Sequence, residues 1–305
     1  MRVSNNTLNQ SMLLELQKTQ SAFADAQERV ATGKIGNSLK DYGSKAELAA
    51  SGRLAQARTE QRIALATEVS ARFDTQAIVL QNSGDAALNL KQEIMDAIGA
   101  NNGAGIGAAL NSAFQQALSA FNTELNGQYL FAGTRADTPP INITTIDQLG
   151  AAPSVASIFT NNTTKPSIDM GNGPIETGQL ASDVATNLFQ AIKTIKDYII
   201  ANGDFGSSLT TAQATFLKAQ LSGLDTASST IIAAEGVNGS NAKFVETQKA
   251  HQDDLRIAIG QFVSNVEDAD IVDASVKVQQ TQLAYEAAAQ TLSKLNSLSL
   301  LDFLR

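Results

Sequence analysis

All five prolines of this 305-residue chain lie between Pro139 and Pro174. A proline inside a helix costs about 3 kcal/mol, because it lacks the backbone donor and clashes with the preceding turn. Residues 1–138 and 175–305 can therefore form long helices, and the segment between them cannot. We predict a mainly α fold, consisting of a long antiparallel helical rod with terminal coiled-coil helices and a small β-rich insert.

The last thirty-five residues carry a regular apolar pattern. Small or apolar residues recur at alternating intervals of three and four, which is the pattern of a coiled-coil seam. Neither glycine nor proline occurs in this stretch. The positions are Ile271, Ala274, Val278, Thr281, Tyr285, Ala288, Leu292, Leu295 and Ser299. A helix with such a face needs a partner helix.

The opposite end of the chain offers a matching pattern. Residues at intervals of four or three form an apolar stripe there, namely Leu8, Met12, Leu16, Thr19, Phe23, Ala26 and Val30. We expect the two terminal helices to pair, within one molecule or in an array of molecules. The alternative is an ordinary helical bundle that uses its terminal helices as core. The candidate assembly residues are Leu8, Met12, Leu16, Phe23, Val30, Ile271, Val278, Tyr285, Leu292 and Leu295.

Between the two ends the pattern predicts further helices. The first runs from Ser44 to Ile98, about 80 Å at ~1.5 Å per residue. Others are expected around 110–125, 184–199 and 217–266, with an interruption of the last at Gly236 and Gly239. The expected domains are terminal helices (1–38 and 268–305), a helical rod (39–135 and 178–267) and a β-rich insert (136–177).

Composition excludes several partners. With 22 basic and 30 acidic residues the net charge is −8, so nucleic acid and anionic membrane surfaces are poor partners. No run of eighteen apolar residues occurs, so we expect no membrane span. The N-terminus lacks the apolar stretch of a cleavable secretory signal. There is no cysteine, which excludes disulfides and thiolate metal sites.

The sequence offers few candidates for catalytic or metal-binding residues. His251 is the only histidine, and it lies in a helical stretch beside acidic residues. The segment 103–107 is glycine-rich but lacks the strand and the Lys-Ser/Thr step of a phosphate-binding loop. The acidic run 267–270 is expected to place negative charge at the start of the last helix. We predict no catalytic residue, no cofactor and no metal. A secreted glycan-binding or hydrolytic protein is an alternative, with Asp147, Asp169 and Glu176 as its few acidic candidates.

Several motifs together resemble a known family. The start at 1–4 and the segments 29–34 and 37–41 resemble the N-terminal region of bacterial flagellins and their junction proteins. The stretch GQYLFAGT at 127–134 and the ending LSLLDFL at 298–304 resemble the hook–filament junction family, hook-associated protein 3 (FlgL). The resemblance covers both arms of the chain and leaves the insert unmatched.

The resemblance implies a structural adaptor of the bacterial flagellum that is not an enzyme. Members of this family are secreted through the flagellar type III channel, and their terminal helices become ordered on assembly at the hook–filament junction. The implied partners are hook-associated protein 1, flagellin, further copies of the chain in a helical ring, and an export chaperone on the C-terminal helix. The insert is expected to be dispensable for export and ring formation. The alternative within the superfamily is flagellin, the bulk filament subunit.

Overall fold

The structure is a computed structural model that describes residues 2–170 and 173–303, without the side chains of residues 2–6, 8, 9 and 295–303. It divides into two compact units. The first contains residues 1–61 and 253–305, and the second contains residues 62–252. The chain passes between the units within two long helices, so each unit is described by itself.

Helices dominate the described residues. They are α1 (Arg2–Thr32), α2 (Ala46–Gly99), α3 (Ile106–Phe121), α4 (Ile146–Ala151), α5 (Ala181–Asn202), α6 (Thr211–Glu267) and α7 (Ile271–Phe303), with 3-10 turns at Leu39–Lys45 and Val155–Ile158. Two short antiparallel hairpins pair β1 (Glu124–Leu125) with β2 (Gln128–Tyr129) and β3 (Ser167–Asp169) with β4 (Pro174–Glu176). The predicted mainly α class with a small β insert is confirmed.

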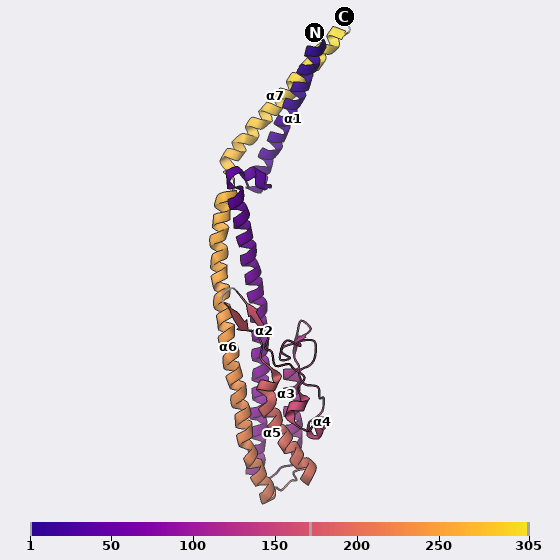
Figure 1. Cartoon of the computed structure of the whole chain (residues 1–305), viewed down its shortest axis with the longest axis vertical. Coiled ribbons are helices and arrows are strands. Elements are labelled where there is room, and N and C mark those ends of the chain that lie inside the picture. The colour runs from indigo at the N-terminus through magenta and orange to yellow at the C-terminus, as the bar shows by residue number, and fades with distance from the viewer. Residues whose placement is uncertain (1, 171–172, 304–305) are drawn as a thin grey trace. The chain divides into compact units, whose positions relative to one another are not determined.

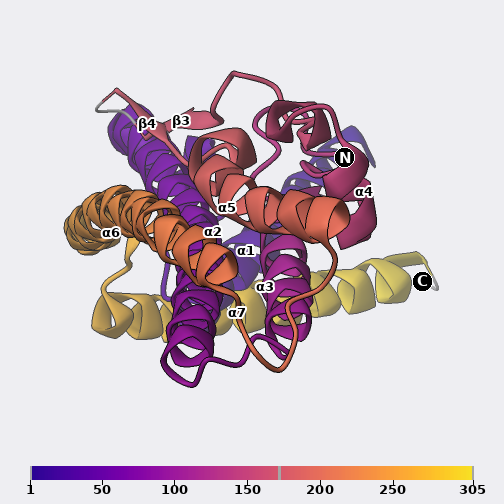
Figure 2. The same cartoon turned by 90° about the horizontal axis from the view of Figure 1, so that it is seen from below.

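The second unit has a continuous hydrophobic core. Helices α2, α3, α5 and α6 contribute their apolar faces to it, and the end-on view of Figure 2 shows these helices grouped together. Aromatic rings fix the contacts between elements. Phe114 of α3 meets Phe189 of α5 edge to face at 6.0 Å between ring centroids, and Phe121 meets Phe131 in the same way at 5.3 Å. The proline-free arms thus fold back on each other as the sequence predicts.

The proline-bearing segment is built into this core. Ile141, Leu149, Val155 and Ile158 are buried in the same cluster as the helical residues. Lys193 of α5 also fastens the segment, because its ammonium donates to the carbonyls of Leu149 and Gly150 at 3.2 and 2.9 Å. The expectation that the insert is dispensable is therefore revised, since replacing 138–176 would strip these side chains from the core.

The end of this segment, at residues 176–177, is hydrogen-bonded to α2 and α6. The carbonyl oxygen of Thr177 accepts hydrogen bonds from Arg72 Nε at 2.9 Å and Gln76 Nε2 at 3.0 Å. Asn241 of α6 donates to the carbonyl of Glu176 at 3.0 Å. Because Gln76 is fully buried, the carbonyl of Thr177 is satisfied inside the protein.

The expected interruption at Gly236 and Gly239 is wrong, because α6 continues through both residues. A Cβ atom at either glycine would meet nothing within 4 Å, so both lie on the open face of the helix. A glycine costs about 1 kcal/mol inside a helix. Ile231, Asn238 and Val245 are buried around them on the opposite face, and this packing offsets the cost.

In the first unit, α1 and α7 lie side by side, as Figure 1 shows. The rings of Phe23 and Tyr285 stack between them, with 6.5 Å between centroids. Helix α1 ends before Gly33, whose φ of 70° is the left-handed conformation that favours glycine after a helix. Helices α6 and α7 are separated only by residues 268–270. The predicted pairing of the terminal helices is thus found within one chain.

Candidate assembly interface

The predicted seam residues lie between the two terminal helices, where they are only partly shielded from solvent. Met12, Leu16 and Phe23 of α1 are half-buried, as are Val278, Tyr285 and Leu292 of α7. The fully buried positions between the two helices are small or polar, namely Ala26, Ala274 and Thr281. The heptad positions therefore mark the contact face between the helices. Whether this face is the assembly seam stays a prediction.

Two predicted seam residues are exposed at the end of the pair near the connecting loops. Val30 retains 38% of its surface and Ile271 retains 47%. The side chains of Leu8 and Leu295 lie outside the described part of the structure. The contact between α1 and α7 is thus best defined from Met12 to Ala26 on one helix and from Ala274 to Leu292 on the other.

The heptad analysis missed five large apolar residues that lie outside the seam on α1 and α7. We call this set the outer strip, and it consists of Leu13, Leu14, Val272, Val276 and Leu283, which retain 50, 58, 72, 47 and 67% of their surface. The run Met12-Leu13-Leu14 could have shown it, since three successive apolar residues cannot all face one partner helix. Exposed large apolar residues of this kind often mark a protein-interaction surface.

The two chain segments that lead to the terminal pair meet at a polar joint. The backbone amide of Ile35 donates to the carbonyl of Glu267 at 2.8 Å, and the amide of Ala269 donates to the carbonyl of Gly33 at 2.8 Å. The Glu267 carboxylate is 1% exposed and binds Lys34 Nζ at 3.0 Å and Arg53 Nε. Hydrogen bonding from Arg53, with help from Lys34, holds the pKa of Glu267 below its ordinary value, although burial acts in the opposite direction.

The acidic run 267–270 therefore has two different roles. As predicted, Asp270 lies at the start of α7, where its carboxylate accepts from the amides of Val272 at 2.9 Å and Asp273 at 3.2 Å. Glu267, by contrast, ends α6 as a buried ion-pair partner. Nothing in the local sequence shows this, because both cations lie more than two hundred residues away along the chain.

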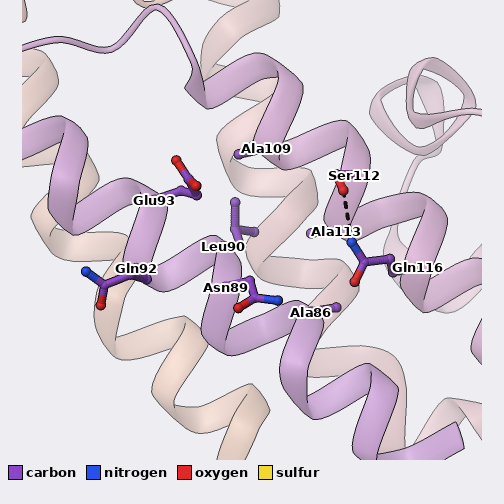
Figure 3. Close-up of a pocket in the computed structure, with 9 residues that line it drawn as sticks. All are labelled: Ala86, Asn89, Leu90, Gln92, Glu93, Ala109, Ser112, Ala113 and Gln116. Carbon is purple, nitrogen blue, oxygen red and sulfur yellow. Dashed lines mark hydrogen bonds between the residues drawn. The ribbon is translucent and has the colours of Figure 1, made fainter.

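A groove of about 290 Å³ lies between α2 and α3 in the second unit. Figure 3 shows the residues that line it, namely Ala86, Asn89, Leu90, Gln92, Glu93, Ala109, Ser112, Ala113 and Gln116. Its polar groups are mainly amides, and Gln116 donates to the Ser112 hydroxyl at 2.9 Å. Without a base beside that hydroxyl, the groove lacks the arrangement of an activated nucleophile.

The three acidic candidates of the insert each contact a neighbouring residue. Asp147 forms an ion pair with Lys196 at 2.7 Å, and Glu176 forms one with Lys165 at 3.3 Å. Asp169 lies on β3 beside the turn, where it accepts from the amide of Gly173 at 3.2 Å. These carboxylates therefore serve local contacts of the insert.

Within 2–170 and 173–303 no group of histidine and acidic residues is placed to hold a metal ion. Over that same part of the chain, no helix combines the length and apolar character needed to cross a bilayer.

Comparison with known proteins gives a family match and related folds. Residues 3–136 match the bacterial flagellin N-terminal helical region. A search of curated proteins found no match. A structure assigned to a flagellar hook-associated protein from Vibrio parahaemolyticus superposes with a TM-score of 0.61 at 13% identity, covering 75% of this chain and 100% of that one.

A second related structure is FlgL of Bacillus cereus. It superposes with a TM-score of 0.55 at 15% identity, covering 71% of this chain and 98% of that one. At these identities the two likenesses concern the fold, and the sequence match concerns the flagellin N-terminal region. The fold of this chain therefore resembles those of a flagellar hook-associated protein and of FlgL, and its residues 3–136 are similar in sequence to the bacterial flagellin N-terminal helical region.

Proposed function

We propose that this protein is a hook–filament junction subunit, secreted and located where the hook of the flagellum meets its filament. It would act as a structural adaptor and not as an enzyme. Residues 1–38 and 268–305 are its assembly segments, and the helical unit with its insert forms the body of the subunit. The proposed neighbours are hook-associated protein 1 on one side and flagellin on the other.

The observation that carries this proposal is the incomplete burial of the terminal pair. The seam between α1 and α7 is only half-buried, and the outer strip is exposed beside it. Two helices alone cannot cover an apolar face wider than one seam, but neighbouring helices can. Copies of the chain arranged head to tail in a ring would bury the outer strip through repeated heterologous contacts.

The same surface explains the need for a chaperone before assembly. Val272, Val276 and Leu283 of α7 expose large apolar side chains that would favour aggregation in a free subunit. We propose that the export chaperone covers this side of α7 until the subunit is delivered.

The proposal is tested by placing a charge on the seam. Leu292 is half-buried between the helices, and an aspartate there would put an unpaired charge in a contact that assembly should bury further. We expect Leu292→Asp to leave unfolding of the second unit unchanged, while cells release flagellin into the medium and lose motility. The matched control is Gln290→Asp, because Gln290 is exposed on the same helix.

Export is measured separately, by blotting the secreted fraction for the variant protein. The proposal fails if Leu292→Asp is exported at normal levels and still supports normal filaments. Loss of export alone would point to the chaperone contact, and supplying the purified variant to hook-bearing cells would then decide whether it can assemble.

Flagellin is the second candidate, favoured by the match of residues 3–136 to the flagellin N-terminal helical region. The two functions differ in how growth ends. A junction subunit stops as a short ring, whereas flagellin extends indefinitely. Electron microscopy of the purified chain, seeded and salted out, distinguishes them, and long filaments of this chain alone would favour flagellin.

A further inference from the structure

Glu267 is an unusual residue for the position it occupies. Among the described residues, Glu267 and Lys193 are the only charged ones that are buried. Lys193 lies within a packed core, whereas Glu267 ends α6, where the chain turns into the terminal pair. A buried carboxylate is tolerated when cations and donors surround it, so the partners of Glu267 show what it does.

Two separate segments of the chain supply cations to this carboxylate. Lys34 comes from the loop after α1 and binds one oxygen at 3.0 Å, while Arg53 comes from α2 and binds the other. Arg53 also donates to the Tyr42 hydroxyl at 3.1 Å and lies over its ring, with 5.5 Å from guanidinium carbon to ring centroid. The Tyr42 hydroxyl in turn donates to the carbonyl of Gly36 at 2.6 Å.

The backbone closes the same joint. The paired hydrogen bonds of Ile35 with Glu267 and of Ala269 with Gly33 tie the two connections, 33–45 and 268–270, to each other. A reorientation of α1 and α7 against the first turns of α2 must therefore disturb the contacts of Glu267 with Lys34, with Arg53 or with both. The carboxylate joins the loop and α2 to the end of α6, beside an apolar contact of Tyr42, Ala49 and Val266.

Loss of the charge on Glu267 would release both of its cationic partners. Lys34 and Arg53 retain 46% and 40% of their side-chain surface, so both cations can turn to water if the carboxylate is neutralised. An amide in place of the carboxylate keeps the shape and leaves no unpaired buried charge. The helices on either side of the joint have their own contacts and should remain formed.

We propose that Glu267 is a latch that holds the terminal helix pair in one orientation on the start of α2, and that neutralising this single carboxylate frees the pair to reorient while its helices stay intact. The latch is a property of the isolated chain. Only its consequence, that an unlatched pair meets the growing assembly in many orientations, rests on the proposed function.

The test measures distances in the full chain. Because the chain has no cysteine, spin labels can be attached at Gln20→Cys and Glu60→Cys, two exposed positions of the first unit. With Glu267 present, the distance distribution between them should be narrow at neutral pH. With Glu267→Gln, it should broaden about twofold or more, as expected when one dominant orientation becomes many.

Two controls separate a latch from general loosening. A second label pair, Gln20→Cys with Gln280→Cys, lies within the terminal pair and should stay narrow in both proteins. Glu246→Gln removes an exposed ion pair with Lys243 and should change neither distribution. If Glu267→Gln lost helicity, Lys34→Gln would replace it, with a smaller broadening expected because one cation remains.

The measured distance distributions test the latch independently of the proposed flagellar function. A distribution between 20 and 60 that is narrow in all variants, or already broad in the parent chain, overturns the latch. Broadening of the 20–280 pair as well would mean that Glu267 holds the helices together and not their orientation, which also overturns it. None of these results would bear on the junction proposal, which depends on assembly in cells.

Discussion

The terminal pair and the helical core of this protein share one periodicity but differ in burial. In the core, Phe114 and Phe189 meet edge to face and are fully buried. In the pair, Phe23 and Tyr285 stack, yet both remain half-exposed. Among the described side chains, seven large apolar residues are exposed on α1 and α7, and seven are exposed in the second unit, which is about three times longer.

The difference shows what a heptad pattern can and cannot specify. Each core helix has neighbours on more than one side, so its stripe is covered completely within the chain. Helices α1 and α7 have only each other. Helix stability comes mostly from packing of the apolar face, so an uncovered pair should gain stability only when further helices arrive. The core is complete in the monomer, whereas under the proposed function the pair would be completed on assembly.

The largest effect should come from removing an aromatic ring from the core. Phe189→Ala deletes a fully buried side chain that touches both Phe114 and Phe159. We expect it to lower the free energy of unfolding by about 3–5 kcal/mol, measured by urea titration with circular dichroism. Phe23→Ala is the matched variant in the terminal pair and should leave this transition almost in place. Equal losses in the two variants would mean that pair and core unfold as one.

A slightly smaller loss is expected from the proline-bearing segment, which tests whether it belongs with the core. Leu149 is fully buried in the same cluster as α3 and α5. Leu149→Ala should lower the free energy of unfolding by about 2–4 kcal/mol. Ile232→Ala is the control, because Ile232 is 59% exposed on α6. If both variants unfold like the parent chain, the segment is an appendage after all, and its deletion should be tolerated.

The sequence predicted the helices better than it predicted the connections between them. Proline placement and heptad spacing gave the positions of α2, α5 and α7 and the pairing of the termini. Gly236 and Gly239 were misread as an interruption, because sequence does not show that their side of α6 is open. The ion pairs of Glu267 could not be foreseen either, since they join residues far apart along the chain. Burial and long-range charge pairing depend on the fold, which periodicity alone does not supply.

A moderate, pH-dependent effect is expected at the joint between the terminal pair and the start of α2. The pKa of Glu267 is depressed, so its contribution is fully present above the unfolded-state value of about 4.3 and is lost as pH falls through the folded-state pKa below it. Lys34 and Arg53 bind the carboxylate, Tyr42 accepts a hydrogen bond from Arg53, and the neighbouring Asp268 accepts one from the Ser264 hydroxyl. The protection factors of the Ile35 and Ala269 amides, which correct for the intrinsic slowing of exchange at acid pH, should therefore fall before those of the core do.

The control for this pH effect is Glu267→Gln, in which those two amides should have low protection factors at every pH. The Glu246 carboxylate also has a lowered pKa, through its hydrogen bond with Lys243, but that pair is exposed and screened by water. Glu246→Gln should leave the acid transition unchanged. An acid transition that survives in Glu267→Gln would have to come from other carboxylates.

The smallest effect on the monomer should come from the outer strip, and it gives the sharpest test of the comparison. Leu283 is 67% exposed, so Leu283→Ser removes almost no contact within the chain and should change the free energy of unfolding by no more than about 0.5 kcal/mol. If neighbours complete the terminal pair, the same change repeats in every subunit of the ring and should weaken the junction, so that cells release flagellin. Gln280→Ser on the same exposed helix provides the control. Normal filaments with Leu283→Ser would show that the outer strip stays in water after assembly, and the half-buried seam alone would then have to hold the subunits together.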